Sequence, residues 1–406
     1  MYLEEMAIRA ERHNNFNGIR LMAALGVLAC HSFALATGEP DNEPLHDWLG
    51  LSLGNLCVVV FFIISGYLTS HSLLSRANPV RFVVARAARI YPALIVVVVL
   101  TALGGGALLS SLAPKAYFAD SRTYQYLLMN LAPVLDVQYT LPGVFEHVPF
   151  NQFVNGSLWT IKFEPWMYVL LLAGWLVTAG LGHQKAFRVL ALGLLGMSTV
   201  CYWQHASLTG PSTVGLLPWL MNMFFVGVAA RLFRSCVPMH LSIALAVAVL
   251  FVALMYCDLG VFKAAYPFCI AYLVLFGAYG LPALNFMQRH DYSYGLYLYA
   301  FPVQQCVATF SPGASPLKMT LLAAPITLAL AVASWHLIEK PALAEVDRVT
   351  TWLQTALRMA TSWIASATLV TRPPFLPSER RLPWLKPAGM KPVAARTSVD
   401  SRLGGL

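Results

Sequence analysis

The sequence is poor in charged residues. Asp, Glu, Lys and Arg together make up 11% of its 406 residues, whereas 58% are hydrophobic. A soluble protein of this length would carry about twice that share of charge. The scarcity argues against a separate water-soluble domain. Because apolar runs recur along nearly the whole chain, the composition predicts one integral membrane domain with short tails.

Patterns typical of metal sites and disulfides are also missing. The seven cysteines are odd in number, lie mostly in apolar stretches and form no C-x-x-C pair. They therefore indicate neither a disulfide framework nor a zinc site. The ten histidines show no H-x-x-x-H or related spacing, so we expect no bound metal. Most of the net charge of +9 lies in alternate loops and the C-terminal tail, which indicates membrane orientation rather than a nucleic-acid partner.

What the sequence has in abundance is apolar runs long enough to cross a bilayer, which takes about 20 residues per helix. We expect an all-α, polytopic integral membrane protein with about ten transmembrane helices, near residues 18–36, 53–72, 89–112, 165–181, 187–203, 214–233, 240–257, 264–283, 294–310 and 318–338. The transmembrane domain would cover residues 1–341. Residues 342–406 would form a cytoplasmic tail, with an interfacial amphipathic helix at 346–370 and a disordered end.

The charges of the loops predict the orientation of the chain. Basic residues collect in alternate loops, as in R-F-V-V-A-R-A-A-R at 81–89, whereas E-P-D-N-E-P-L-H-D at 39–47 has neither Lys nor Arg. Because loops rich in Lys and Arg stay on the cytoplasmic side, we expect both termini to be cytoplasmic. Residues 113–164 then form a long external segment.

An arginine and a histidine lie inside the first apolar span. Arg20 and His31 are eleven residues apart, about three helical turns, so both side chains face the same way, roughly 16 Å apart along the axis. His31 lies nearer the outer side, where an imidazole is suited to be a general base. An interhelical hydrogen bond is its alternative role. Arg20, at the cytoplasmic entrance, fits either ligand binding or ordinary positive-inside bias.

Two further arginines precede the third span. Arg86 and Arg89 are one helical turn apart and share a face. Guanidinium groups so placed can bind the phosphate oxygens of a nucleotide-bearing cofactor in bidentate fashion. Snorkelling to the membrane interface is the alternative explanation for both.

Glu164 directly precedes Pro165, a residue suited to the first position of a helix. We therefore expect Glu164 at the outer mouth of the fourth span, where free amide groups stabilise a carboxylate. Three roles are open: capping the helix, pairing with Lys162, or orienting the imidazole of His31.

Five short motifs occur in order along the chain. They are F-N-G-I-R followed by His after ten residues (16–31), F-F-I-I-S-G-Y-L (61–68), R-F-V-V-A-R-A-A-R-I-Y-P (81–92), S-L-W-T-I-K-F-E (157–164) and S-W-H-L-I-E-K-P (334–341). Together they resemble the acyltransferase-3 family of membrane O-acyltransferases over most of residues 14–341. Three positions depart from the family pattern: Asn17 stands where Asp is commoner, Pro165 replaces a second Glu, and Ala300 replaces a His.

The resemblance implies transfer of an acyl group, usually acetyl, from cytoplasmic acyl-CoA to a hydroxyl of an extracytoplasmic or lipid-linked glycan. In this scheme Arg20, Arg86 and Arg89 hold the CoA phosphates at the inner face. His31 deprotonates the acceptor hydroxyl, and Glu164 holds the tautomer of the imidazole. Direct transfer and a covalent acyl-histidine relay are both open, as are acetyl and succinyl.

The resemblance also implies a location and partners. We expect a multi-pass protein of the bacterial cytoplasmic (inner) membrane, surrounded by lipid and associated with a polysaccharide biosynthesis complex. The alternative function is a transporter or flippase for a lipid-linked sugar, without acyl transfer and without an acyl-CoA site. A non-catalytic scaffold in a polysaccharide export complex is a third.

Overall fold

The computed structural model describes residues 1–10, 13–132, 136–179, 183–208, 213–283 and 288–370. The described chain is built from helices, with no β-strand longer than an isolated bridge. Its contacts divide it into two units, Met1–Gln354 and Thr355–Leu406. The cavity, the ion pairs and the substituted residues discussed below all belong to the first unit.

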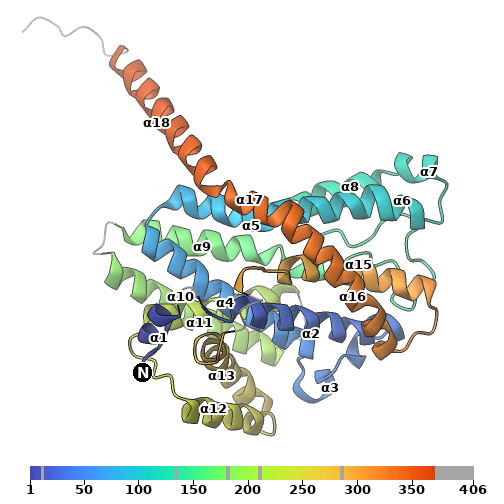
Figure 1. The fold of residues 1–406 in the computed structure, drawn as a ribbon, viewed down its shortest axis with the longest axis horizontal. Coiled ribbons are helices and arrows are strands. Elements are labelled where there is room, and N and C mark those ends of the chain that lie inside the picture. The colour runs from blue at the N-terminus through green and yellow to red at the C-terminus, as the bar shows by residue number, and fades with distance from the viewer. Residues whose placement is uncertain (11–12, 133–135, 180–182, 209–212, 284–287, 371–406) are drawn as a thin grey trace, which may run out of the picture. The chain divides into compact units, whose positions relative to one another are not determined.

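Each of the ten predicted spans overlaps a helix (Figure 1). These helices are α2 (Phe16–Thr37), α4 (Leu53–Arg76), α5 (Pro79–Val99), α9 (Phe163–Thr178), α10 (Gln184–Leu208), α11 (Thr213–Leu232), α12 (Leu241–Leu254), α13 (Leu259–Tyr279), α15 (Ser293–Phe310) and α16 (Pro316–Ser334). Among the described residues, seven helical segments are long and apolar enough to span a membrane, and they contain α2, α4, α5, α10, α11, α13 and α16. The prediction of an all-α, multi-pass membrane protein is confirmed, whereas the count of ten spans stays a prediction.

Further helices connect or extend these, and all but the 25-residue α18 are short. They are α1 (Leu3–Arg9), η1 (Pro40–Asn42), α3 (His46–Leu49), the π-helical η2 (Leu100–Gly105), α6 (Gly106–Leu109), α7 (Pro114–Ala119), α8 (Ser121–Leu131), η3 (Gly156–Thr160), the π-helical η4 (Trp335–Glu339), α17 (Lys340–Ala344) and α18 (Val346–Val370). The helix predicted at 346–370 is α18, and its interfacial position stays a prediction. The end predicted to be disordered lies outside the described residues.

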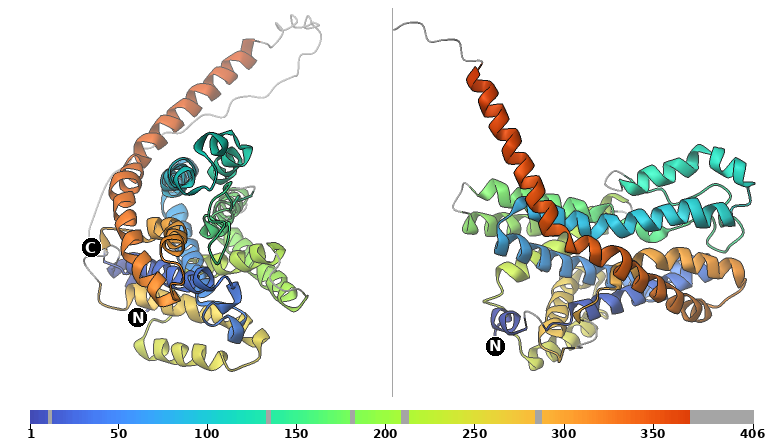
Figure 2. Two further views of the ribbon diagram at one scale, coloured as in Figure 1. Left: turned by 90° about the vertical axis from the view of Figure 1, so that its right-hand side faces the viewer. Right: turned by 45° about the horizontal axis from the view of Figure 1, so that its top comes forward.

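Charged loops gather at two opposite ends of the helical bundle (Figures 1 and 2). One end, here called the basic end, carries the junction between α4 and α5, with Arg76 at the end of α4 and Arg81 in the first turn of α5. The other, here called the acidic end, carries the loop with Glu39, Asp41 and Asp47 between α2 and α4. The predicted orientation of the chain in the membrane rests on this alternation of basic and acidic connections. That the basic end and both termini are cytoplasmic stays a prediction from the positive-inside rule.

Two glycines let α4 and α11 pack backbone to backbone. A Cβ built on Gly66 would lie 2.0 Å from the carbonyl oxygen of Phe224, and one built on Gly227 would lie 2.1 Å from that of Ile63. Inside a membrane, where lipid tails are as apolar as side chains, helices associate through such close packing of small residues. Gly66 belongs to the S-G-Y-L motif, so the structure gives this motif a packing role.

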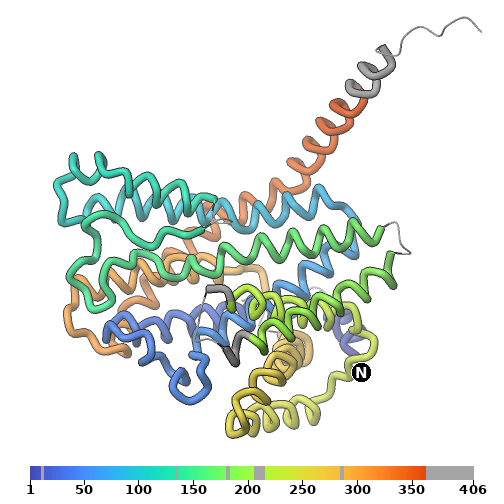
Figure 3. The backbone as a smooth tube through the Cα atoms, turned by 180° about the vertical axis from the view of Figure 1, so that it is seen from behind, coloured from blue at the N-terminus to red at the C-terminus, as the bar shows by residue number. Residues whose placement is uncertain are grey.

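Residues 136–162, which precede α9, turn back into the bundle (Figure 3). Asn155, Ser157 and Thr160 are at most 5% exposed. The side chain of Asn155 donates a hydrogen bond to the backbone carbonyl of Leu298 in α15, at 3.0 Å. Irregular backbone is tolerated at membrane depth only where protein surrounds it or it lines a cavity. This corrects the expectation of an external segment up to residue 164, because its last part lies inside and carries Glu164 with it.

The glycine contact leads to a first prediction. Gly227→Ala forces α4 and α11 apart, and overpacking of this kind costs about 1–3 kcal/mol. We expect a lower unfolding temperature and less monodisperse protein in detergent, measured by thermal unfolding and size-exclusion chromatography.

Gly193→Ala on α10 is the matched control, because nothing lies within 4 Å of a Cβ built there. Alanine favours a helix over glycine by about 0.5–1 kcal/mol, so this variant should be slightly more stable than the wild type. Equal unfolding temperatures for Gly227→Ala and the wild type would contradict the interpretation of the α4–α11 contact.

Candidate active site

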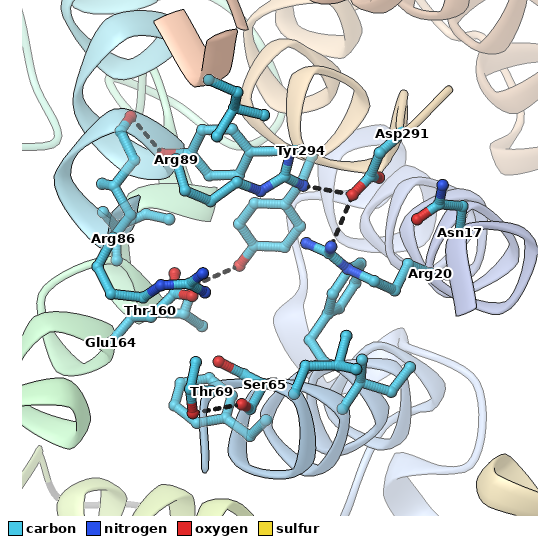
Figure 4. Close-up of a pocket in the computed structure, with 18 of the residues that line it drawn as sticks. Asn17, Arg20, Ser65, Thr69, Arg86, Arg89, Thr160, Glu164, Asp291 and Tyr294 are labelled. Carbon is cyan, nitrogen blue, oxygen red and sulfur yellow. Dashed lines mark hydrogen bonds and ion pairs between the residues drawn. The ribbon is translucent and has the colours of Figure 1, made fainter. Parts of the chain in front are cut away.

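A cavity of about 420 Å³ lies among α2, α4, α5, α9 and α15 (Figure 4). Arg289, which is exposed, is one of the residues that line it. The charged side chains that line it are Arg20, Arg86, Arg89, Glu164, Arg289 and Asp291, and the side chains at its inner end include Val58, Phe61, Thr160 and Tyr297. Ionisable groups inside a membrane bundle are costly, and by default they mark a functional site.

Asp291, just ahead of α15, holds two of these arginines. Its Oδ2 accepts hydrogen bonds from Nη1 of Arg20 and Nη2 of Arg89, each at 2.6 Å. The Ser293 hydroxyl donates to its Oδ1 at 2.5 Å. Burial by itself raises the pKa of Asp291, but the charges of Arg20 and Arg89 outweigh burial and lower the pKa to about 2. The carboxylate is therefore ionised at physiological pH.

A second carboxylate completes this network. Glu339 in η4 lies 3.5 Å from Nη1 of Arg89 and accepts a hydrogen bond from the Ser334 hydroxyl at 2.9 Å. Arg20 and Arg89 thus both have acidic partners, which is the usual condition for keeping a charge buried. These ion pairs join α2 and α5 to Asp291, just ahead of α15, and to Glu339 in η4, just after α16. All four parts of the chain are thereby held around the cavity.

Unlike Arg20 and Arg89, Arg86 forms no ion pair with a carboxylate in the described part of the chain. Its guanidinium lies over the ring of Tyr168, 5.7 Å from the ring centroid. Its Nε is buried without a hydrogen-bond partner in the described part of the chain, as is Nε1 of Trp335, another residue that lines the cavity. Both atoms are donors, and a buried donor is expected to meet an acceptor. The cavity therefore suits a ligand rich in acceptor oxygens.

The structure brings Glu164 to the arginines rather than to His31. Glu164 lies in the first turn of α9, in agreement with the predicted position at a helix start. It accepts a hydrogen bond from the hydroxyl of Tyr168, the same ring that lies under Arg86. Within the described residues no hydrogen bond or ion pair joins Glu164 to His31 or to Lys162. Its depth in the bundle follows from the inward turn of the preceding segment.

His31 lies outside the lining of the cavity. It shares the face of α2 that packs on α15, as predicted from its spacing to Arg20. Its ring meets that of Phe301 edge-on, at 5.5 Å between centroids and 75° between planes. Its Nδ1 is buried and has no hydrogen-bond partner in the described part of the chain.

The cavity ends about one helical turn short of His31. A Cβ built on Gly54 of α4 would lie 3.2 Å from Sγ of Cys30, so Gly54 marks the level of His31 on α4. The cavity extends along α4 to Val58, four residues or about 6 Å from that level. Phe61 and Tyr297, with ring centroids 5.9 Å apart, lie at this inner end.

The sequence analysis missed Asp291 and Glu339 as site residues. Glu339 lies in the S-W-H-L-I-E-K-P motif, but nothing local to the motif shows its partner. Arg20 and Asp291 are 271 residues apart, too far for periodicity to pair them. The sequence did contain one signal for these residues. Each is a carboxylate beside an apolar span among basic residues, and the positive-inside rule gives no reason for a carboxylate there.

These features define a multi-pass α-helical membrane protein with an internal, arginine-lined cavity. Among the described residues, no group of three or more His, Cys, Asp or Glu side chains is arranged to hold a metal. The acyltransferase-3 family model, described as an acyltransferase domain, matches residues 13–338. The chain belongs to this family and is a membrane acyltransferase, which confirms the resemblance and favours acyl transfer over a pure transporter.

Two relatives cover most of the chain. The O-acetyl transferase of Shigella phage Sf6 is 31% identical over 340 residues, which are 81% of this chain and 96% of the relative. Nodulation protein 10 of Rhizobium leguminosarum bv. viciae is 29% identical over 364 residues, which are 81% of this chain and 93% of the relative. No solved structure matches the chain significantly.

The ion network leads to a second prediction. Asp291→Asn leaves the guanidinium groups of Arg20 and Arg89 without their shared counter-charge, and breaking a buried pair from one side costs about 3–5 kcal/mol. Because the pKa of Asp291 is about 2, below its usual 3.8, its stabilising effect is complete above the usual value and is lost as the pH falls toward 2. The stability difference between wild type and variant should be constant from about pH 5 to 8 and shrink below about pH 4.

Thermal unfolding in detergent at each pH measures this difference. Asp347→Asn is the control, since Asp347 pairs with Arg81 at 2.7 Å but is 78% exposed and such surface pairs contribute little. If both variants unfold at the wild-type temperature, Asp291 does not hold the two arginines as described.

Proposed function

We propose that this protein transfers an acyl group, typically acetyl, from cytoplasmic acyl-CoA to a hydroxyl of an extracytoplasmic or lipid-linked glycan in the bacterial inner membrane. The observation that carries the proposal is the arginine-lined cavity at the basic end of an acyltransferase-3 chain. The family supplies the acyl chemistry, and the cavity supplies a site for a polyanionic donor. The phage relative is named an O-acetyl transferase, which supports acetyl as the group and oxygen as the acceptor.

The charges of the cavity suit the phosphates of CoA. Among the described residues, four arginines line it against the two carboxylates Glu164 and Asp291. Arg20 and Arg89 are already held by Asp291 and Glu339, so they fix the shape of the site. Arg86 is the guanidinium in position to form new charge-assisted hydrogen bonds with phosphate oxygens.

Glu164 has a positioning role in this proposal. Its carboxylate accepts a hydrogen bond from the hydroxyl of Tyr168, and the Tyr168 ring lies under Arg86. This contact fixes the ring and thereby the guanidinium above it. The role replaces the expectation that Glu164 holds the tautomer of His31.

His31 is the proposed general base. The acyl-bearing arm of CoA would extend beyond Val58 across the remaining turn of helix. An imidazole nitrogen takes the proton of the acceptor hydroxyl while the hydroxyl oxygen attacks the thioester carbonyl. The C–O bond forms, the C–S bond breaks, and the CoA sulfur leaves and takes up the proton. Direct transfer and an acyl-histidine relay both fit this placement.

A third prediction tests the donor site. Arg86→Ala should raise the Kd for acetyl-CoA about 10- to 100-fold, because a hydrogen bond to a charged group contributes about 1.5–3 kcal/mol. Arg86→Lys should restore only part of the affinity, since an ammonium cannot reproduce the planar fork. Titration calorimetry on the purified full-length protein measures both.

Arg122→Ala is the control for this prediction. Arg122 lies on α8, pairs with Asp120 at 2.6 Å and is 59% exposed, so its removal should leave the Kd unchanged. An unchanged Kd for Arg86→Ala would eliminate Arg86 as a phosphate ligand.

A fourth prediction tests the base. His31→Ala, at normal expression, should abolish transfer of the acyl group to glycan while the Kd for acetyl-CoA stays within twofold of the wild type. The readout is base-labile acyl ester on glycan from a gene-deletion strain complemented with each variant. Full glycan acylation by His31→Ala would refute the assignment, and a wild-type gene that moves glycan without adding ester would support a transporter instead.

A further inference from the structure

A second group of buried polar side chains lies around Phe301, on the acidic-end side of the cavity. Each member has a side-chain atom without a hydrogen-bond partner in the described part of the chain: Nδ1 of His31, Oδ1 of Asn155, Oγ of Ser157, Oε1 of Gln304 and Oε1 of Gln305. Apart from His31, all are at most 1% exposed. We call these five residues the Phe301 cluster.

Hydrogen bonds fix the orientation of the three amides. Nδ2 of Asn155 donates to a backbone carbonyl at 3.0 Å. Nε2 of Gln304 donates to a backbone carbonyl and to a serine hydroxyl, each at 2.7 Å. Nε2 of Gln305 donates to two backbone carbonyls at 2.6 and 2.8 Å. A carbonyl only accepts, so the nitrogens must occupy these positions and the oxygens are the unpaired ends.

Three separate elements bring the cluster together at Phe301. The ring of His31 on α2 meets the Phe301 ring at 5.5 Å. Gly156 lies so close that a Cβ built there would be 2.5 Å from a ring carbon of Phe301, which places the neighbouring Asn155 and Ser157 beside the ring. Gln304 and Gln305 follow Phe301 on α15 by about one helical turn. Gln304 also reaches Ser32, the residue after His31.

The chemistry of the cluster is the opposite of that of the cavity. The unpaired atoms in the cavity, Nε of Arg86 and Nε1 of Trp335, are donors, whereas the three amide oxygens of the cluster are acceptors. A buried polar atom without a partner costs about 1–3 kcal/mol, so several in one place call for an explanation. A ligand rich in O–H donors, with few charges, would satisfy them.

We propose that the Phe301 cluster binds the hydroxyl groups of the molecule that receives the acyl group. The inference rests on the proposed function and adds the acceptor subsite to it. The amide oxygens of Asn155, Gln304 and Gln305 accept hydrogen bonds from the flanking hydroxyls of a polyhydroxylated, sugar-like ligand. The Ser157 hydroxyl joins them, while His31 faces the hydroxyl that reacts.

Ser157→Ala is the most discriminating variant. It removes one unpaired hydroxyl and breaks no hydrogen bond of the described chain. Tyr126→Phe on α8 is the matched control, since it removes another buried, unpaired hydroxyl away from the cluster. Each variant should be at least as stable as the wild type, because each deletes an unsatisfied buried group.

The assay uses membranes from the gene-deletion strain complemented with each full-length variant. Radiolabelled acetyl-CoA is added, and the initial rates of label transfer to extracted glycan and of label release as free acetate are measured. Ser157→Ala should lower the transfer rate about five- to tenfold, raise the ratio of free acetate to glycan ester, and leave the Kd for acetyl-CoA within twofold. Tyr126→Phe should match the wild type in transfer rate, in the ratio of free acetate to glycan ester and in the Kd for acetyl-CoA.

A wild-type transfer rate for Ser157→Ala would overturn the inference and leave the proposed function intact. So would an unstable Ser157→Ala protein, because the hydroxyl would then serve the fold. Loss of transfer together with an equal loss of acetyl-CoA binding would also overturn it. Membranes with the wild-type protein that transfer no label to glycan would instead refute the proposed function itself, and the inference with it.

Discussion

One carboxylate controls how positive charge is kept inside this apolar bundle. Asp291 contacts Arg20 of α2 and Arg89 of α5 through a single oxygen, at 2.6 Å each. A guanidinium inside a membrane domain is costly unless it is paired, so the positions of α2, α5 and the start of α15 depend on this contact. The same contact neutralises two arginines and leaves Arg86, one turn from Arg89, chemically distinct.

The two polar regions of the interior are complementary and are connected through α15. Tyr294 and Tyr297 on this helix line the donor-rich cavity, and Phe301 with the two glutamines that follow it belongs to the acceptor-rich cluster. A transfer between two substrates requires each to have its own recognition chemistry and the reacting groups to meet where the sites adjoin. In the proposed transfer the cavity takes the donor and the Phe301 cluster takes the acceptor, and these two regions adjoin near Val58 and His31, about one helical turn apart.

Particular residues show how far prediction from sequence reached. The spacing of Arg20 and His31 placed both on one face of a helix, and both do pack toward α15. Glu164 was misplaced because the polar, aromatic segment before it has the composition of an external loop. Its burial depends on partners such as Leu298, which is 143 residues from Asn155. No local pattern contains that information.

By itself, the sequence determined the membrane class, the positions of the main helices, the family motifs and the identity of the buried arginines and histidine. These follow from composition and from periodicities of a few residues, which are local properties of a chain. The tertiary structure alone decided that Glu164 joins the arginines, that Asp291 neutralises two of them, and that His31 lies beyond the cavity beside Phe301. Such pairings depend on which distant helices pack together, because a buried charge or amide must find its partner wherever the fold places one.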